Sequence, residues 1–192
     1  MMGKAPHNIE SDGTFFLQTR RLVFRTWTFN DLGFALDLWG DPQVTRFFDA
    51  RERLTSKEVR ERLAQEIAGQ DDHGVQYWPI FLRSSHEHVG CCGLRPYRPP
   101  SNIYEIGFHI RSRHWGNGYA TEAAHRVIAY AFEDLNAHGL FAGHNPQNTA
   151  SRHLLRKLGF RYTHDEFYAP TGLQHPSYMM TADEYRLRQD KI

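Results

Sequence analysis

The chain has 192 residues, of which 40% are hydrophobic and 14% aromatic. This is enough apolar material for one well-packed core, so we expect a single domain. Lys and Arg together number 23 against 22 for Asp and Glu, a balance that does not favour nucleic-acid binding. No apolar run reaches the roughly 18 residues of a membrane span, and no charged and then apolar leader opens the chain. We therefore expect a cytoplasmic protein that contacts neither a membrane nor nucleic acid.

The cysteines and histidines indicate neither a disulfide framework nor a metal site. Cys91 and Cys92 are adjacent, and in a strand they would point to opposite faces and pack in the core. A chain without a disulfide framework is typical of a reducing compartment such as the cytoplasm. Only His86 and His88 form a close strand-type histidine pair, and no third ligand stands at a telling spacing. We expect no metal cofactor.

The N-terminal part of the chain predicts a strand followed by two helices. Residues 16–27 alternate well enough for a strand, and Thr28 or Asn30 then caps the first helix. Thr55 and Glu58 form a capping box for the second helix. The expected inner-face residues are Leu32, Leu36 and Trp39 in the first helix, and Val59, Leu63 and Ile67 in the second.

The rest of the chain predicts a meander of strands followed by alternating helices and strands. This order implies an α+β fold, a mixed and mostly antiparallel sheet flanked by helices. We expect residues 1–13 to be a flexible leader, residues 14–180 to form the single domain, and residues 181–192 to be a C-terminal tail or short helix. The expected elements are strands at residues 76–83, 88–94 and 103–110, a helix at 117–135, a strand at 140–144, a helix at 151–158 and a strand at 160–163.

The most informative segment is residues 114–123, HWGNGYATEA, which places a glycine-rich turn against the start of a helix. Gly116 and Gly118 lack the side chains that would keep an anion away. A helix N-terminus offers unpaired N–H groups and the positive end of its dipole, each worth about 0.3–1 kcal/mol to a nearby anion. The preceding strand, residues 103–110, completes the order strand, turn, helix. This order predicts a pyrophosphate-binding turn.

Two well-known nucleotide-binding motifs do not fit this turn. A dinucleotide-binding Rossmann unit needs G-x-G-x-x-G, whereas here Ala120 follows Gly116 and Gly118 at the wrong spacing. A Walker P-loop needs Gly-Lys-Ser/Thr, which does not follow these glycines. A nucleotide-binding α/β protein is therefore kept as a rival hypothesis, which predicts stabilisation by ATP or NAD.

The pattern G-x-G-x-A at the start of a helix resembles the acyl-coenzyme A pyrophosphate loop of the GCN5-related N-acetyltransferase (GNAT) superfamily. WGNGYATEA is similar to the version in its RimJ/RimL-type branch. One position departs, since the general family pattern has Gln or Arg where this chain has Trp115. The segments that carry the resemblance are residues 17–27, 40–48, 88–94, 105–110 and 145–160.

The resemblance implies the GNAT fold, in which the fourth and fifth strands of a twisted sheet splay apart, and acetyl-coenzyme A (acetyl-CoA) as the co-substrate. The pantetheine arm would lie beside Phe108, His109 and Ile110, and the backbone N–H of Phe108 or Ile110 would stabilise the oxyanion. Asn148 and Ser151 would also contact the coenzyme, although N-x-x-S before a helix can be a cap alone. The residues expected at the coenzyme are Phe108, His109, Ile110, Trp115, Gly116, Asn117, Gly118, Tyr119, Ala120, Thr121, Asn148 and Ser151.

Glu105 and Ser151 are the catalytic residues that the resemblance implies. Glu105 lies on the strand beside the expected thioester and would accept a proton from the amine, directly or through water. His109, on the same face, is the alternative base. Ser151 would donate a hydrogen bond to the departing thiolate, and Tyr162 or Tyr168 is the alternative acid.

The expected activity is transfer of an acetyl group from acetyl-CoA to a primary amine, by direct attack in a ternary complex. The acceptor is either a protein N-terminus or a small molecule such as a polyamine, an amino acid or an aminoglycoside. An α-amino group, with a pKa of about 7.7–8.0, is neutral far more often than a lysine with a pKa of about 10.4. The alternative is a noncatalytic acyl-CoA-binding sensor or scaffold. The expected assembly is a monomer or a homodimer.

Two groups of residues bear on the acceptor. A run of basic residues around the start of the second helix marks either a solvated helical face or a surface that guides an acidic acceptor. A set of aromatic residues either lines an acceptor cleft or packs in the core. The basic residues are Arg51, Arg53, Lys57, Arg60 and Arg62, and the aromatic residues are Trp39, Phe47, Phe48, Tyr77 and Trp78.

Overall fold

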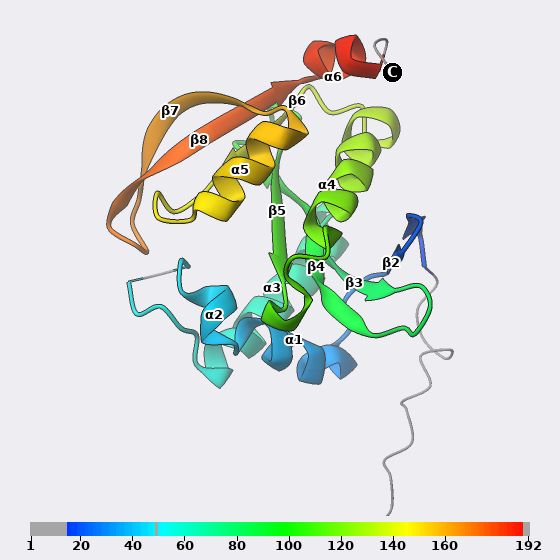
Figure 1. Cartoon of the computed structure of the whole chain (residues 1–192), viewed down its shortest axis with the longest axis vertical. Coiled ribbons are helices and arrows are strands. Elements are labelled where there is room, and N and C mark those ends of the chain that lie inside the picture. The colour runs from blue at the N-terminus through cyan, green and yellow to red at the C-terminus, as the bar shows by residue number, and fades with distance from the viewer. Residues whose placement is uncertain (1–14, 49, 190–192) are drawn as a thin grey trace, which may run out of the picture.

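The computed structural model describes residues 15–48 and 50–189, which form an eight-stranded sheet with helices around it (Figure 1). The strand order is β1-β2-β3-β4-β5-β6-β8-β7. The predicted leader, residues 1–13, lies outside the described residues. The predicted tail begins with Thr181, the last residue of a strand, and continues as the helix α6 (Ala182–Gln189). The strands are β1 (Leu17–Gln18), β2 (Leu22–Phe24), β3 (Tyr77–Leu82), β4 (His88–Tyr97), β5 (Ile103–Ile110), β6 (Gly139–Gly143), β7 (Arg161–Tyr168) and β8 (Leu173–Thr181), and the other α-helices are α1 (Leu32–Trp39), α2 (Pro42–Thr45), α3 (Ser56–His73), α4 (Tyr119–Ala129) and α5 (Thr149–Leu158).

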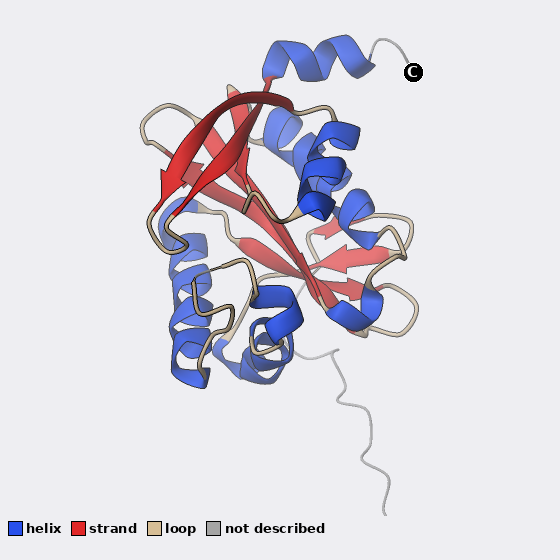
Figure 2. Cartoon of the chain, turned by 60° about the vertical axis from the view of Figure 1, so that its left-hand side comes forward, coloured by secondary structure: helices blue, strands red, loops and turns tan. Residues whose placement is uncertain are grey.

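The sheet is mixed but mostly antiparallel, as the sequence predicts. β5 and β6 run parallel, and every other neighbouring pair of described strands is antiparallel. Helices cover both faces of the sheet (Figure 2), with α1 and α3 on one side and α4 and α5 on the other. Within the described part of the chain, no helix is both long enough and apolar enough to cross a membrane.

Each face of the sheet has its own hydrophobic core, and the two cysteines of β4 show the division. Cys91 belongs to the core beneath α1 and α3, together with Trp39 and Tyr77. Cys92 belongs to the larger core beneath α4 and α5. Both thiols are free and fully buried, so the prediction that they are core residues is confirmed.

β5 and β6 separate after a short stretch of pairing. Residues 103–105 of β5 pair with residues 139–141 of β6, and among the described residues no further pair joins these two strands. From Ile106 to Ile110 the edge of β5 that faces β6 is therefore unpaired. In the family resemblance, residues 105–110 correspond to the fourth strand and the next strand along the chain, residues 140–144, to the fifth. These are β5 and β6 here, so the predicted splay is confirmed.

The first helix starts later than predicted and is rotated about its axis. Thr28 caps a 3₁₀ turn, Phe29–Asp31, and α1 begins only after it. Leu32 and Leu36, which the sequence places on the inner face, are only half-buried. Ala35 lies in the core instead, because a small side chain can be enclosed where the helix approaches the sheet closely. The buried hydrophobic residues of α1 are Ala35, Leu38 and Trp39.

Two strand predictions are corrected by the structure. The single strand expected at residues 16–27 is a hairpin of the two short strands β1 and β2. β8 is absent from the sequence prediction although it lies inside the sheet, between β6 and β7. Pro176 argues against a strand interior because proline donates no ladder hydrogen bond. The β6–β8 ladder ends at the pair of Gly143 with Ser177, and Pro176 lies just beyond this end. Proline is therefore tolerated here, because β6 needs no ladder hydrogen bond from this residue.

Two later elements occur where predicted but with other bounds. The helix expected at residues 117–135 is α4, which begins at Tyr119 and continues as the π-helical segment Tyr130–Asp134. The strand expected at residues 160–163 is the first part of β7, which runs on to Tyr168. Neither difference moves the glycine-rich turn, which still precedes α4 directly.

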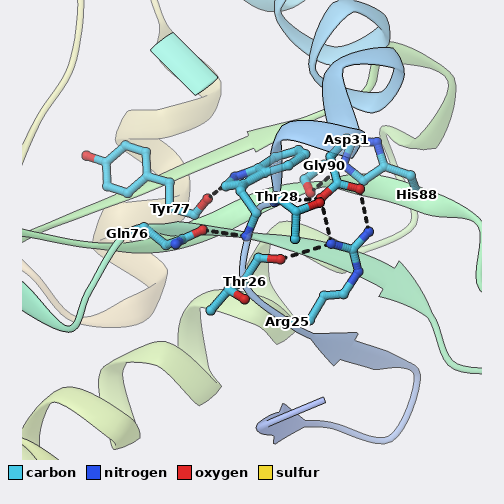
Figure 3. A network of polar contacts seen from close by, with 9 residues as sticks. Arg25, Thr26, Thr28, Asp31, Gln76, Tyr77, His88 and Gly90 are labelled. Atoms are coloured by element: carbon cyan, nitrogen blue, oxygen red, sulfur yellow. Dashed lines mark hydrogen bonds and ion pairs between the residues drawn. The ribbon is translucent and has the colours of Figure 1, made fainter. Parts of the chain in front are cut away.

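A buried polar network fixes the segment between β2 and α1 against β3 (Figure 3). Arg25 donates two hydrogen bonds to Asp31, at 2.7 and 2.8 Å, within a buried pair. The indole of Trp27 donates to the Tyr77 carbonyl at 2.7 Å, and the Trp27 backbone N–H donates to Gln76 Oε1 at 2.8 Å. Removing one partner of a buried ion pair costs about 3–5 kcal/mol, because the other charge is left unpaired. The network therefore holds the start of β3, and with it Tyr77, in place.

Candidate active site

A cavity of about 1000 Å³ occupies the gap between β5 and β6. One end, which we name the turn end, is formed by the residues around the glycine-rich turn before α4. The other, which we name the arginine end, is formed by Arg62, Tyr77, Arg95 and Glu105. Asn117 and Thr121 are predicted site residues that do not line the cavity. The predicted site residues that line it are Glu105, Phe108, His109, Ile110, Trp115, Gly116, Gly118, Tyr119, Ala120, Asn148 and Ser151.

Two left-handed glycines build the turn in front of α4. Gly116 and Gly118 have φ angles of +77° and +76°, which cost other residues about 1 kcal/mol or more. Gly118 is the N-cap of α4, and no side chain caps this helix. Asn117 braces the turn by donating from Nδ2 to the carbonyls of His114 and Trp115, at 3.1 and 3.2 Å. The first amides of α4 are thus free to bind an anion.

The negative charge in the first turn of α4 is neutralised by the β1–β2 hairpin. Glu122 accepts hydrogen bonds from Thr19 Oγ1 at 2.6 Å and from the Arg21 backbone N–H and Nε at 2.8 and 2.6 Å. Burial raises the pKa of Glu122, but these bonds outweigh it and hold the pKa below its usual range. The Arg21 guanidinium also lies over the Tyr119 ring, 4.7 Å from its centroid. A cation that the sequence analysis missed therefore flanks the turn and favours an anion there.

The unpaired edge of β5 offers backbone groups to the cavity. The N–H of Arg111 donates to the carbonyl of Val89, which precedes Gly90 on β4, at 2.9 Å. Alternate residues of a strand face opposite edges, so Phe108 and Ile110 direct their N–H and C=O groups into the gap. The indole Nε1 of Trp115 donates to the Ile110 carbonyl at 2.8 Å. No described residue accepts a backbone hydrogen bond from the N–H groups of Phe108 and Ile110.

At the arginine end, Tyr77 lies flat across the sheet toward Glu105. Tyr77, Gly93 and Gly107 are neighbours in one row across β3, β4 and β5. A Cβ on residue 107 would overlap the Tyr77 ring, so the phenol covers β5 only because that residue is glycine. Glu105 is the next residue on this face of β5, and the Tyr77 hydroxyl interacts with its carboxylate.

Charged side chains that are buried or half-buried surround this pair. Glu66 of α3 is buried, its Oε2 accepts from the Tyr77 backbone N–H at 2.8 Å, and its Oε1 accepts from Arg95 Nη2. The Arg95 guanidinium lies over the Tyr77 ring, 4.3 Å from its centroid. Burial raises the pKa of Glu105 above its usual range, although Arg95, Arg62 and Tyr77 act in the opposite direction. Glu105 therefore holds a proton more tightly than an exposed glutamate, as suits a general base.

His109 is enclosed by aromatic rings and is not an open base. Its ring centroid lies 4.6 Å from that of Phe48 and 5.7 Å from that of Tyr77. Its Nδ1 accepts a hydrogen bond from Trp39 Nε1 at 3.3 Å, which requires that Nδ1 carries no proton. Burial, reinforced by the nearby arginines, lowers the pKa of His109 well below its usual range. The ring is therefore neutral, and its one lone pair is already engaged.

Asn148 and Ser151 lie at the start of α5. Asn148 is the N-cap, and its Oδ1 accepts from the Ser151 backbone N–H at 3.1 Å. Both residues line the cavity, and so does Tyr168. Tyr162 is outside the lining, with its hydroxyl 3.3 Å from Asp165 Oδ1 on the exposed side of β7. Of the hydroxyl groups considered as acids, Ser151 and Tyr168 thus share the cavity with Glu105.

The histidine pair considered for a metal is separated in the structure. His88 is buried, and its Nε2 makes a 3.0 Å hydrogen bond with the Gly90 carbonyl. Burial lowers the pKa of His88 to about 3. His86 is exposed in the turn before β4. Over residues 15–48 and 50–189, no cluster of three or more His, Cys, Asp or Glu side chains is arranged to hold a metal ion.

The basic run is divided between the two alternatives that the sequence left open, a solvated face and a surface that meets the acceptor. Arg60 and Lys57 are exposed, whereas the Arg62 side chain is only 19% exposed and lines the cavity. A signal for this existed, because position 62 follows Val59 by three and precedes Glu66 by four, and both of these are buried. Among the aromatic candidates, Phe47, Phe48 and Tyr77 line the cavity, and Trp39 and Trp78 are buried in the cores.

Comparisons with known proteins agree with one another. Residues 21–161 match the acetyltransferase (GNAT) domain family. YoaA of Bacillus subtilis (strain 168), described as an uncharacterised N-acetyltransferase, is 31% identical over 147 residues, which are 76% of this chain and 82% of YoaA. A GNAT-family acetyltransferase from Bacillus anthracis superposes with a TM-score of 0.75 at 22% identity, covering 89% of this chain and 100% of that chain. RimL, a ribosomal L7/L12 alpha-N-protein acetyltransferase in complex with coenzyme A, superposes with a TM-score of 0.75 at 13% identity, covering 89% of this chain and 99% of RimL.

Proposed function

Because the chain belongs to the GNAT family of N-acetyltransferases, we propose that it transfers the acetyl group of acetyl-CoA to a primary amine in the cavity between β5 and β6. The observation that supports this best is that one cavity joins an uncapped helix N-terminus, an unpaired strand edge and the half-buried carboxylate of Glu105. Transfer is direct, within a ternary complex. Burial raises the pKa of Cys91 and Cys92, so neither supplies a thiolate for a covalent route.

In this proposal the turn end of the cavity binds the coenzyme. The free amides at the start of α4 bind the diphosphate, and Gly116 and Gly118 let it approach the backbone. Arg21 offsets the negative charge of Glu122 at the flank of the turn, so that this carboxylate does not repel the diphosphate. The unpaired edge of β5 binds the pantetheine arm in place of a neighbouring strand, which brings the thioester toward Glu105.

Glu105 accepts the proton that the amine loses. The amine nitrogen forms a bond to the thioester carbonyl carbon, and the carbon–sulfur bond breaks as the coenzyme thiolate departs. Glu105 takes the proton from the nitrogen, directly or through a water molecule, and an equivalent proton ends on the sulfur. The N–H of Phe108 or Ile110 donates to the carbonyl oxygen while that oxygen carries negative charge. The products are an acetamide and the free thiol of coenzyme A.

Ser151 is the proposed donor to the departing sulfur. Its backbone N–H is bonded to the Asn148 cap, which fixes the residue at the cavity wall. A hydroxyl at this position can stabilise the thiolate by donating a hydrogen bond. Tyr168 lines the same cavity and is the alternative acid.

The proposed acceptor is a protein N-terminus or a small-molecule amine, and the proposed location is the cytoplasm. Free cysteines that are both buried fit a reducing compartment. The RimL comparison supports the protein N-terminus only as a shared fold, since the identity is 13%. The charges of the arginine end bear on the choice more directly.

Release of the coenzyme thiol from acetyl-CoA, measured with a panel of amines, tests the proposed function. We expect thiol release to depend on at least one amine, and mass spectrometry to show one added acetyl group on that amine. Binding of acetyl-CoA with no amine-dependent release would support the sensor alternative instead. Stabilisation by ATP or NAD, with none by coenzyme A, would contradict both and support a nucleotide-binding protein.

A further inference from the structure

Arg62 is a largely buried cation that makes no hydrogen bond to any residue in the described part of the chain. Its guanidinium lies over the rings of Trp39 and Phe48, 4.9 and 5.1 Å from their centroids. Its Nε is buried without a partner, and its other nitrogens make no hydrogen bond to any described residue. Guanidinium N–H groups that have lost water need acceptors. Because Arg62 lines the cavity, a molecule bound there can supply them.

The neighbouring carboxylates do not satisfy Arg62. Glu66 Oε1 lies 4.0 Å from Arg62 Nη2, which is beyond hydrogen-bonding distance. Both oxygens of Glu66 already accept hydrogen bonds, one from Arg95 and one from the Tyr77 backbone N–H. Glu105 is close enough to feel the charge of Arg62 but makes no ion pair with it within 4.0 Å. Arg62 thus lies near the proposed base, and none of its N–H groups donates to a residue that the structure describes.

The charges of the cavity lining favour an anion at this end. Glu166 is paired with Arg98 at 2.7 Å, and Arg95 is paired with Glu66. Arg46 has a ring contact with Phe47 at 4.6 Å and no acidic partner among the described residues. Among the described lining residues outside these pairs, there are two cations, Arg46 and Arg62, and one carboxylate, Glu105. The charged residues of the lining are Arg46, Arg62, Arg95, Glu105 and Glu166.

We propose that the acceptor is a small amine that also carries a carboxylate, and that Arg62 binds this carboxylate while Glu105 receives the amine. The inference rests on the proposed acetyl transfer and names its substrate class. The two oxygens of a carboxylate match two parallel N–H groups of a guanidinium. Trp39 and Phe48 already hold that guanidinium in place, so little conformational entropy is lost on binding.

The other acceptor classes fit this end of the cavity less well. A polyamine or an aminoglycoside would bring several positive charges toward Arg46 and Arg62. A peptide N-terminus has an amide, not a carboxylate, beside its amine, and leaves the Arg62 donors without an anionic partner. An amino acid brings both groups on one small molecule.

Matched acceptor pairs test the inference in the wild-type protein. Each pair is a free amino acid and its carboxamide, drawn from the standard α-amino acids with β-alanine and 4-aminobutanoate added, so that only the carboxylate is removed. The diamine 1,4-diaminobutane and a neutral tripeptide complete the panel. kcat and KM are measured from thiol release at saturating acetyl-CoA and compared at equal concentrations of neutral amine. For at least one amino acid we expect a KM about tenfold or more below that of its carboxamide.

A variant series assigns this preference to Arg62. Arg62→Gln is expected to raise the KM of the amino acid about tenfold or more and to leave the KM values of its carboxamide and of acetyl-CoA unchanged. Arg62→Lys keeps the charge without the two-point geometry, so it should restore only part of the preference. Arg60→Gln, on the exposed face of the same helix, is the matched control. If Arg62→Gln does not fold, Arg62→Lys and the wild-type pairs carry the test.

Three results would overturn the inference while leaving acetyl transfer intact. They are equal KM values within every pair, a preference for the diamine or the tripeptide over every amino acid, and a carboxylate preference that Arg62→Gln retains. If no amine releases thiol, the proposed function fails instead, and the inference is then tested by the binding of amino acids and their carboxamides. Thermal stabilisation of the coenzyme A-saturated protein by an amino acid but not by its carboxamide would then support it, and equal stabilisation by both, or by neither, would contradict it.

Discussion

The two ends of the cavity are built from different material. The turn end is made of main-chain amides, at the start of α4 and along the unpaired edge of β5. The arginine end is made of side chains, Arg62, Tyr77, Arg95 and Glu105, which come from four different elements. A backbone site needs little more than a strand, two glycines and a helix in order. A side-chain site needs the correct register of several strands and the correct rotation of a helix. Coenzyme binding and acceptor chemistry should therefore be separable by mutation.

The largest effect on coenzyme binding alone is expected for a substitution at Gly118. Gly118→Glu places a carboxylate at the N-cap of α4, so the affinity for coenzyme A should fall about a thousandfold, as when more than one charge-assisted hydrogen bond is lost. Isothermal titration calorimetry with coenzyme A measures this. Gly74→Glu is the matched control, since Gly74 has a φ of +70°, open space around it and no place in the cavity lining. Unchanged affinity in Gly118→Glu would remove the turn from the coenzyme site.

A substitution at Glu105 is expected to have a smaller effect, and to lower turnover where the Gly118 substitution lowers coenzyme affinity. Glu105→Gln should lower kcat about a hundredfold and leave coenzyme affinity unchanged. Burial raises the pKa of Glu105, so in the wild type the base is lost, and kcat falls, as the pH drops through that raised pKa. The variant has no carboxylate to titrate, so this acid limb of the pH profile should disappear. Glu61→Gln, exposed on α3, is the control. A pH profile that keeps the limb would show that another group is the base.

The smallest effect is expected for a substitution at Gly107, which tests whether Tyr77 positions Glu105 within the arginine end. Gly107→Ala adds a Cβ that overlaps the Tyr77 ring, so the phenol must move away from Glu105. We expect a loss of about 1–3 kcal/mol in unfolding free energy from overpacking, and a kcat reduced about tenfold. Coenzyme affinity should not change. Gly139→Ala is the control, because its added Cβ would lie 3.3 Å from its nearest neighbour and outside the cavity. Full activity in Gly107→Ala would mean that Tyr77 has no part in positioning Glu105.

The division between backbone and side chains also explains what could be predicted from the sequence. The glycine-rich turn was predictable because residues 114–123 contain its whole local order, and the splayed sheet followed from the family resemblance. The sequence leaves open whether Arg62 belongs to a solvated face or to an acceptor surface, because its burial depends on which side of α3 meets the sheet. Tyr77 was recognised only as one aromatic among several. Its position over Gly107 depends on the register of β3, β4 and β5, which no local pattern contains.

The features that the sequence did not predict have the same cause. β8 contains Pro176, and local rules exclude proline from a strand interior. Pro176 is tolerated only because the pairing of β8 with β6 stops at Ser177, before it reaches the proline. α1 buries Ala35, which a search for large apolar residues passes over. Arg21 reaches the turn through a hairpin far earlier in the chain. In each case a contact between distant segments decides the outcome.

The central claim is that backbone groups at the turn end bind the coenzyme. A crystal structure with coenzyme A bound tests this claim most directly. The account predicts electron density for the diphosphate at the amides of residues 116–120, and for the pantetheine arm along the β5 edge, with the sulfur directed toward Glu105. Coenzyme density on another surface, with the gap between β5 and β6 filled by protein atoms, would contradict it.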